Sequence, residues 1–239
     1  GLCSWTIVLL AAMSAGVLSD AVAAQSRVAP GIPDKPLPTV FQELLPDITA
    51  GKSDARNRWQ RICFAAGAPG NEALRVEACK LMCAVLGAQT PAEARVWLIR
   101  QLEHIGRGES VEALAAALAD PDLLVADAAC RALANNPAPQ AGAKLRAAVQ
   151  QTSDGRRKVA LICALGYRAE PESVPLLAQQ LTADAKTATA AAQALERIAT
   201  AEAAAALIAL LPKTQGQLRL VVGDAYLRCA DRLLREGRT

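Results

Sequence analysis

Leucines recur at a nearly constant spacing along this chain, within segments whose other apolar residues lie three and four positions apart. One series is spaced by 31 residues each time and consists of Leu114, Leu145, Leu176 and Leu207. A second series, spaced by 30 to 32 residues, consists of Leu102, Leu133, Leu165, Leu195 and Leu227. Apolar positions three and four apart indicate amphipathic helices. The two series therefore predict pairs of short helices that repeat with a period of about 31 residues.

Small residues accompany the second series. Ala128, Ala129 and Ala132 share one helix face with Leu133, and similar alanines precede Leu165 and Leu195. Alanine at these positions lets neighbouring helices approach closely. A single helix pair cannot bury its apolar stripe alone, so consecutive pairs must stack on one another. An ordinary helical bundle would not require a constant phase over four copies, and the pattern predicts an all-α fold, an α-solenoid of antiparallel helix pairs.

The stretch "LAAALADPDLLVADAACRALA" resembles HEAT repeats, in particular the short HEAT-like units of phycobilisome lyase subunits. The positions that carry the resemblance are Asp120, Val125, Ala128, Ala129 and Leu133. It extends over about 91–212 and is weaker over 53–90 and 213–237, and Ala126 stands where the family often has a basic residue. The resemblance implies a right-handed stack with a concave face lined by the second helices. It says little about activity, because one repeat architecture serves many functions.

Helix ends are marked by turn and capping residues. Thr90 precedes Pro91 and lies three residues before Glu93, a pattern that predicts a capping box with the Thr90 side chain as N-cap. Gly87, Gly106 and Gly166 lie at or near expected helix ends, where glycine accepts a left-handed backbone.

The beginning of the chain has a different character. An apolar run of 14 residues, "WTIVLLAAMSAGVL", is followed by small residues that suit signal-peptidase cleavage near Ala24. We expect a signal peptide over 1–24, truncated at its start, a Pro-rich linker over 25–40, an N-terminal helical segment over 41–90 and HEAT-like repeats over 91–239. The alternative is an uncleaved N-terminal anchor, although a membrane span needs roughly 20 apolar residues. Either reading predicts an exported protein, periplasmic or extracellular.

Export would place the cysteines where disulfides form. A turn between two antiparallel helices would bring Cys63 close to Cys79 or Cys83, and we expect a disulfide between Cys63 and Cys79. The spacing of Cys79 and Cys83 also suits a metal site, but a single histidine in the chain argues against zinc. The remaining cysteines after the leader are expected to be small core residues: Cys130, Cys163 and Cys229.

The sequence contains no arrangement that indicates catalysis or a cofactor. His104 is the single histidine, and no Gly-x-Ser-x-Gly elbow or phosphate-binding loop occurs. The acid pairs Asp120/Asp122 and Glu170/Glu172 are explained by helix capping. The formal net charge is only +3, with 26 basic and 23 acidic residues intermixed, which disfavours a nucleic-acid surface. We expect no enzyme activity, no metal and no cofactor.

One series of polar residues follows the second-helix leucines. Two positions after a leucine lies about 200° around the helix, and this places His104, Asn135, Tyr167 and Arg197 away from the leucine face. We expect them to form an exposed row that binds another protein, the alternative being an ordinary solvated edge. The function predicted is that of a monomeric exported scaffold for protein binding, without contact to nucleic acid or to membrane beyond an N-terminal anchor. Two alternatives remain: an accessory subunit of the phycobilisome-lyase type, and the helical part of a larger exported enzyme.

Overall fold

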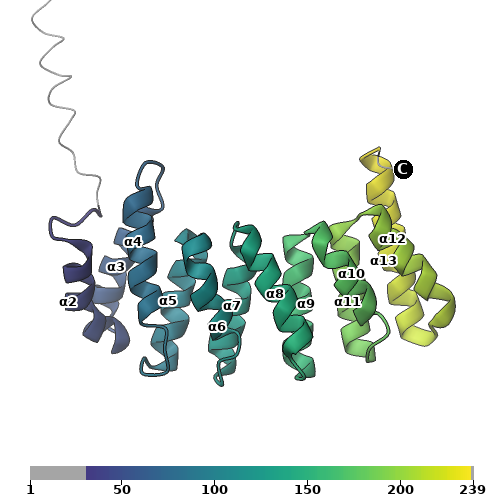
Figure 1. Cartoon of the computed structure of the whole chain (residues 1–239), viewed down its shortest axis with the longest axis horizontal. Coiled ribbons are helices and arrows are strands. Elements are labelled where there is room, and N and C mark those ends of the chain that lie inside the picture. Colours follow the sequence, from purple (N-terminus) through teal and green to yellow (C-terminus); the bar gives the residue numbers. More distant parts are fainter. Residues whose placement is uncertain (1–30, 238–239) are drawn as a thin grey trace, which may run out of the picture.

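The computed structural model describes residues 31–237, and this range forms a single row of packed helices without any strand (Figure 1). The predicted all-α solenoid is confirmed. Short 3-10 turns at Gly108–Ser110, Pro171–Ser173 and Leu211–Lys213 precede α6, precede α10 and follow α12. The α-helices are α2 (Leu37–Thr49), α3 (Ser53–Ala66), α4 (Glu72–Ala84), α5 (Ala92–Ile105), α6 (Val111–Ala117), α7 (Leu123–Asn135), α8 (Pro139–Gln151), α9 (Gly155–Arg168), α10 (Val174–Gln180), α11 (Ala185–Ile198), α12 (Ala201–Leu210) and α13 (Gly216–Arg235).

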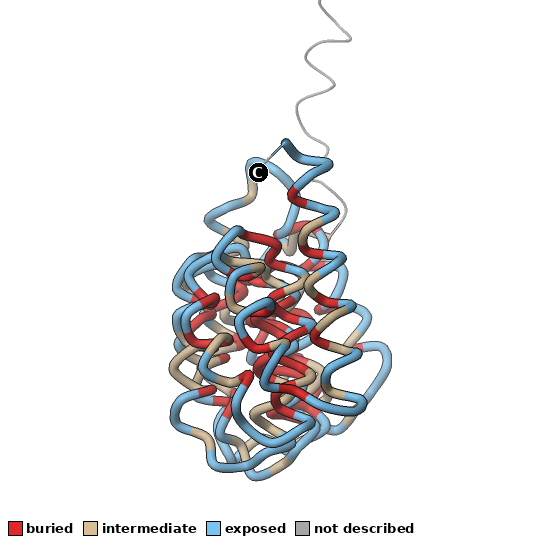
Figure 2. The backbone as a smooth tube through the Cα atoms, turned by 90° about the vertical axis from the view of Figure 1, so that its right-hand side faces the viewer, coloured by how far each residue is buried: buried red, intermediate tan, exposed pale blue. Residues whose placement is uncertain are grey.

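The helices form consecutive pairs, from α2–α3 to α12–α13, and each pair stacks on the next. The second helices of the pairs contact one another in sequence from α3 to α13, while the first helices form the other layer. Buried positions gather along the inner sides of both layers (Figure 2). Each pair therefore supplies apolar surface to its neighbour, as a solenoid requires.

The first leucine series is confirmed: Leu114, Leu145, Leu176 and Leu207 are all buried, each in the first helix of its pair. Where the polar Gln180 interrupts the apolar position four residues after Leu176, the buried Leu181 replaces it, as the sequence indicates.

The second series holds for Leu102, Leu133, Leu165 and Leu195 but is wrong for Leu227, which is 66% exposed. The buried positions of α13 lie 35 residues after buried positions of α11, rather than 32. The chain between the two helices contains α12 and an extra 3-10 turn, and this added length rotates α13 relative to the leucine spacing. The matching pairs are Thr187 and Val222, Ala190 and Ala225, Ala194 and Cys229, and Ile198 and Leu233.

The Pro-rich linker expected over 25–40 extends too far. Helix α2 begins at Leu37, and both Leu37 and Val40 are buried in the core. Pro36 occupies the N-cap position, because proline suits the start of a helix, and the sequence pattern mistook this start for tether. The signal peptide expected over 1–24 and the linker residues 25–30 lie outside the described residues.

Helix capping differs from the expected capping box at α5. The Thr90 hydroxyl donates to the Val85 carbonyl at 2.6 Å, and α5 begins without a side-chain cap. Aspartates instead cap three of the second helices: the side-chain oxygens of Asp122, Asp154 and Asp184 accept hydrogen bonds from backbone N–H groups at the starts of α7, α9 and α11. The bond from the Arg157 N–H lowers the pKa of Asp154.

Gly166 has a packing role rather than the expected role in a turn. It lies inside α9, and a Cβ atom at this position would come within 2.8 Å of both Cα and Cβ of Ala194 in α11. The absent side chain therefore allows these two second helices to approach closely. The left-handed conformation at the ends of α9 and α11 is adopted by Ala169 and Ala199, with φ of 53° and 50°.

Arginines connect successive helix pairs through ion pairs. Arg95 of α5 reaches Asp120 in the turn before α7, and both side chains are largely buried, with exposed fractions of 9% and 10%. Such pairs fix the rotation of one helix pair on the next, because a guanidinium group has several donors in a fixed geometry. The others are Arg56 with Glu93, Arg75 with Glu109, and Arg146 with Glu170.

Candidate functional site

The four residues of the predicted partner-binding row, His104, Asn135, Tyr167 and Arg197, are all exposed in the structure. Each lies in the last turn of a second helix, in α5, α7, α9 and α11 respectively. We refer to these four residues as the second-helix edge. The structure thus places them at equivalent points of four successive repeats, while their role in binding stays a prediction.

Polar contacts hold part of this edge in place. The carboxylate of Glu103 accepts hydrogen bonds from Asn135 Nδ2 at 2.8 Å and from Arg131 Nε at 2.9 Å. The carbonyl oxygen of Arg197 accepts a bond from Arg232 at 2.8 Å. The backbone and amide positions are therefore set by the stack, and an incoming partner would meet side chains that are partly preorganised.

A shallow hollow of about 330 Å³ lies beside Tyr167, between the C-terminal ends of α7 and α9. Its lining consists of Ala134, Asn135, Asn136, Pro137, Tyr167 and Arg168. Tyr167 is 63% exposed, so its ring and hydroxyl are accessible at the rim. The hollow therefore offers an aromatic face, a proline ring and one side-chain amide, groups that suit contact with a protein surface.

Arg168 contributes to this hollow structurally rather than as a free charge. Its guanidinium group donates to the carbonyl oxygens of Leu133 at 2.7 Å and Ala138 at 3.2 Å, and it is paired with Glu170. These bonds satisfy carbonyl groups at the end of α7 that have no partner within the helix. A ligand in the hollow would thus interact with Tyr167 and Asn135 and not with an unpaired cation.

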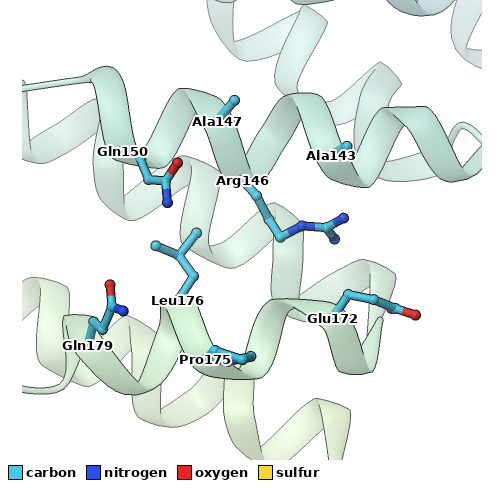
Figure 3. A pocket seen from close by; sticks show the side chains of 8 residues that line it. All are labelled: Ala143, Arg146, Ala147, Gln150, Glu172, Pro175, Leu176 and Gln179. Carbon is cyan, nitrogen blue, oxygen red and sulfur yellow. The ribbon is translucent and has the colours of Figure 1, made fainter.

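A second hollow, of about 370 Å³, lies between the first helices α8 and α10 (Figure 3). Gln150 and Gln179 stand on its opposite walls, with Leu176 between them. Arg146 also lines it but is bonded to Glu170 Oε2 at 3.2 Å. The leucine spacing gave no indication of this groove, and the only sequence signal is the presence of glutamines towards the ends of these two first helices.

The disulfide expected between Cys63 and Cys79 is not formed: both are free, buried thiols in α3 and α4. Each is enclosed by apolar side chains of its own helix junction, and burial raises the pKa of Cys63 to about 12. Burial, followed by the nearby Glu109 carboxylate, raises the pKa of Cys79. Cys130 and Cys229 are buried as expected, whereas Cys163 is exposed and the expectation of a core position was wrong.

We expect thiol-specific reagents to distinguish these cysteines. In the folded protein at mildly alkaline pH, Cys163 should react rapidly, while Cys63 and Cys79 should react only on unfolding, because a raised pKa and burial both reduce the reactive thiolate. Peptide mapping by mass spectrometry after timed alkylation would measure each rate, with Cys163→Ser as the control. Rapid labelling of Cys63 in the folded state would contradict the structure.

Within residues 31–237 no group of three or more His, Cys, Asp or Glu side chains is placed to hold a metal ion. None of the helices described there is long and apolar enough to cross a bilayer.

Comparison with known proteins places this architecture. Residues 79–163 match the family model for HEAT repeats. A search of curated proteins finds no match. Among solved structures, the chain is similar to the crystal structure of an engineered protein, with 21% identity over 80% of this chain and 96% of that chain and a TM-score of 0.44, a value too low to establish a common fold. The family match and the stacked helix pairs together identify the chain as a HEAT-repeat protein.

Proposed function

We propose that this chain is a non-enzymatic scaffold that binds another protein through the second-helix edge. The observation that carries the proposal is the position of Tyr167, a largely exposed aromatic side chain at the rim of a hollow that Asn135 and Pro137 also line. Tyrosine is enriched among the residues that dominate binding energy at interfaces, since it combines a large apolar face with a hydroxyl group.

The repeat architecture supports this proposal. Because the second helices stand in register, residues at one helical position form a row along the stack, and a partner can contact several repeats at once. Arg197 continues the row two residues after Leu195, and arginine is also common among interface anchors. The absence of catalytic motifs from the sequence favours binding over chemistry, and the apolar leader favours a role outside the cytoplasm.

A site-specific photocrosslinker at position 167 would test the proposal. We expect it to capture one defined protein from extracts of the native envelope, whereas the same crosslinker at Phe64, an exposed aromatic residue on α3, should not. With the captured partner purified, Tyr167→Ala and Arg197→Ala should each weaken affinity, by about 30-fold for an anchor residue.

Circular dichroism and thermal unfolding would serve as controls, because both side chains are exposed and their loss should leave the fold intact. Phe64→Ala is the matched substitution and should leave affinity unchanged. A partner whose affinity is insensitive to both Tyr167→Ala and Arg197→Ala would show that the second-helix edge is not the binding surface. Export would be tested separately by locating the chain in fractionated cells.

A further inference from the structure

The outer face of α13 carries a stripe of exposed leucines. Leu220, Leu227 and Leu234 are spaced by seven residues and are 68%, 66% and 67% exposed. They lie on the opposite side of the helix from Val222, Ala225, Cys229 and Leu233, which are buried. Soluble proteins rarely leave such a contiguous apolar face uncovered, so this stripe requires an explanation.

The position of the stripe in the repeat indicates what kind of surface it is. Gly223, Leu227 and Ala230 lie 35 residues after Ala188, Ala192 and Leu195 of α11, the same offset that relates the buried faces of the two helices. In α11 these three residues are fully buried, because α11 is packed between α9 and α13. Among the described helices α13 contacts only α11 and α12, and it stands at the end of the row (Figure 1). Its outer face therefore corresponds to a face that receives another second helix.

We propose that a second copy of this chain covers this face, with the two α13 helices packed side by side and parallel about a two-fold axis. The leucines at every seventh position alternate with the small residues Gly223 and Ala230, at spacings of three and four. This is the apolar repeat of a two-stranded coiled coil, in which a large side chain from one helix fits between residues of the other. Each leucine of the stripe would face the same leucine of the second copy.

The charges beside the stripe favour the parallel arrangement. Arg219 lies on one side of the leucines, and Asp224 and Asp231 lie on the other. In a parallel pair, Arg219 comes opposite Asp224 of the second copy, five residues further along, and the two-fold axis repeats this contact. An antiparallel pair would instead place the acidic sides of both helices together. Asp224 already pairs with Arg228 at 3.0 Å but remains 60% exposed, so it is accessible to a second cation.

A two-fold contact of this kind is closed, because the same surface is used by both copies, and it predicts a dimer rather than a filament. This differs from the monomer expected from the sequence. It involves neither Tyr167 nor the hollow beside it, and it stands or falls independently of the proposed function.

Sedimentation equilibrium of the full chain would test the pairing. We expect a mass of two chains, and Leu227→Glu should raise the dissociation constant of the dimer by at least about 100-fold, since two leucines lose their apolar contact. The matched control is Leu124→Glu, at a leucine that is 69% exposed on α7, and it should leave the mass unchanged. Far-UV circular dichroism would verify that both variants are folded. A full chain that sediments as a monomer, or equal loss of the dimer in both variants, would overturn the proposal.

Cysteine crosslinking would test the orientation. In a background with Cys163→Ser, we expect Leu220→Cys to form a disulfide with its own copy under mild oxidation, because parallel helices place position 220 opposite position 220. Antiparallel helices would instead join Leu220→Cys to Leu234→Cys in a mixture of the two variants. Crosslinking in the mixture alone would refute the parallel pairing.

Discussion

Replacing Leu195 by alanine should lower the free energy of unfolding by about 2–5 kcal/mol, whereas the same change at Leu227 should alter it by less than about 0.5 kcal/mol. Both leucines belong to the same series in the sequence. Leu195 is fully buried in α11 between two neighbouring second helices, so its loss leaves a cavity that the rigid stack cannot close. Leu227 is mostly exposed on the outer face of α13 and loses few contacts.

Urea unfolding followed by far-UV circular dichroism would measure both free energies. The protein should be dilute, so that association through α13 does not contribute. Comparable destabilisation by the two substitutions would show that α13 is packed in the register of the leucine spacing and not in the one observed. The comparison therefore tests the rotation of α13 directly.

Replacing Asp120 by alanine should destabilise the protein by about 3–5 kcal/mol, the cost expected when one partner of a buried ion pair is removed. The Arg95 guanidinium group would keep its charge in a largely buried position without the carboxylate that now faces it. Asp120 also accepts a hydrogen bond from the Asp122 N–H at 2.9 Å, and this bond would be lost as well. The damage should thus concentrate at the junction between α5 and α7.

The matched control is Asp127→Ala on the surface of α7. Asp127 faces Arg156 at 4.0 Å, with both side chains largely exposed, and such pairs contribute about 0–1 kcal/mol. Adding Arg95→Met to Asp120→Ala should recover part of the lost stability, because the unpaired buried charge is removed. Equal effects of Asp120→Ala and Asp127→Ala in urea unfolding would mean that the Arg95–Asp120 pair is solvated and not buried.

Much of the fold could be predicted from local patterns, and the errors have specific causes. The leucines of the first helices and the alanines of the second helices show their periodicity within each helix, so the all-α solenoid was predictable. Gly166 was misinterpreted, because a glycine near a helix end and a glycine at a helix contact look the same in one sequence. Thr90 was misinterpreted because the Val85 carbonyl, which binds its hydroxyl, lies in the preceding turn and competes with the capping position.

The candidate site was predictable only in part. Counting two residues from each second-helix leucine located the four residues of the second-helix edge, and all of them are exposed. The hollow beside Tyr167 could not be found this way, since its wall includes Pro137 of the loop after α7 and depends on how Arg168 binds the end of that helix. The groove between α8 and α10 likewise depends on the distance between two helices.

The amino-acid sequence by itself determined that the chain is helical, that its helices come in pairs and that the pairs must stack, because hydrophobic periodicity is a local property that each helix carries. Only the tertiary structure decided the rotation of each pair on the next, and with it the burial of Leu195, the exposure of Leu227 and the separation of the Cys63 and Cys79 thiols. The physical reason is that rotation depends on loop length, close contacts such as Gly166 on Ala194, and ion pairs between residues far apart in the sequence. These contacts exist only once the helices are assembled.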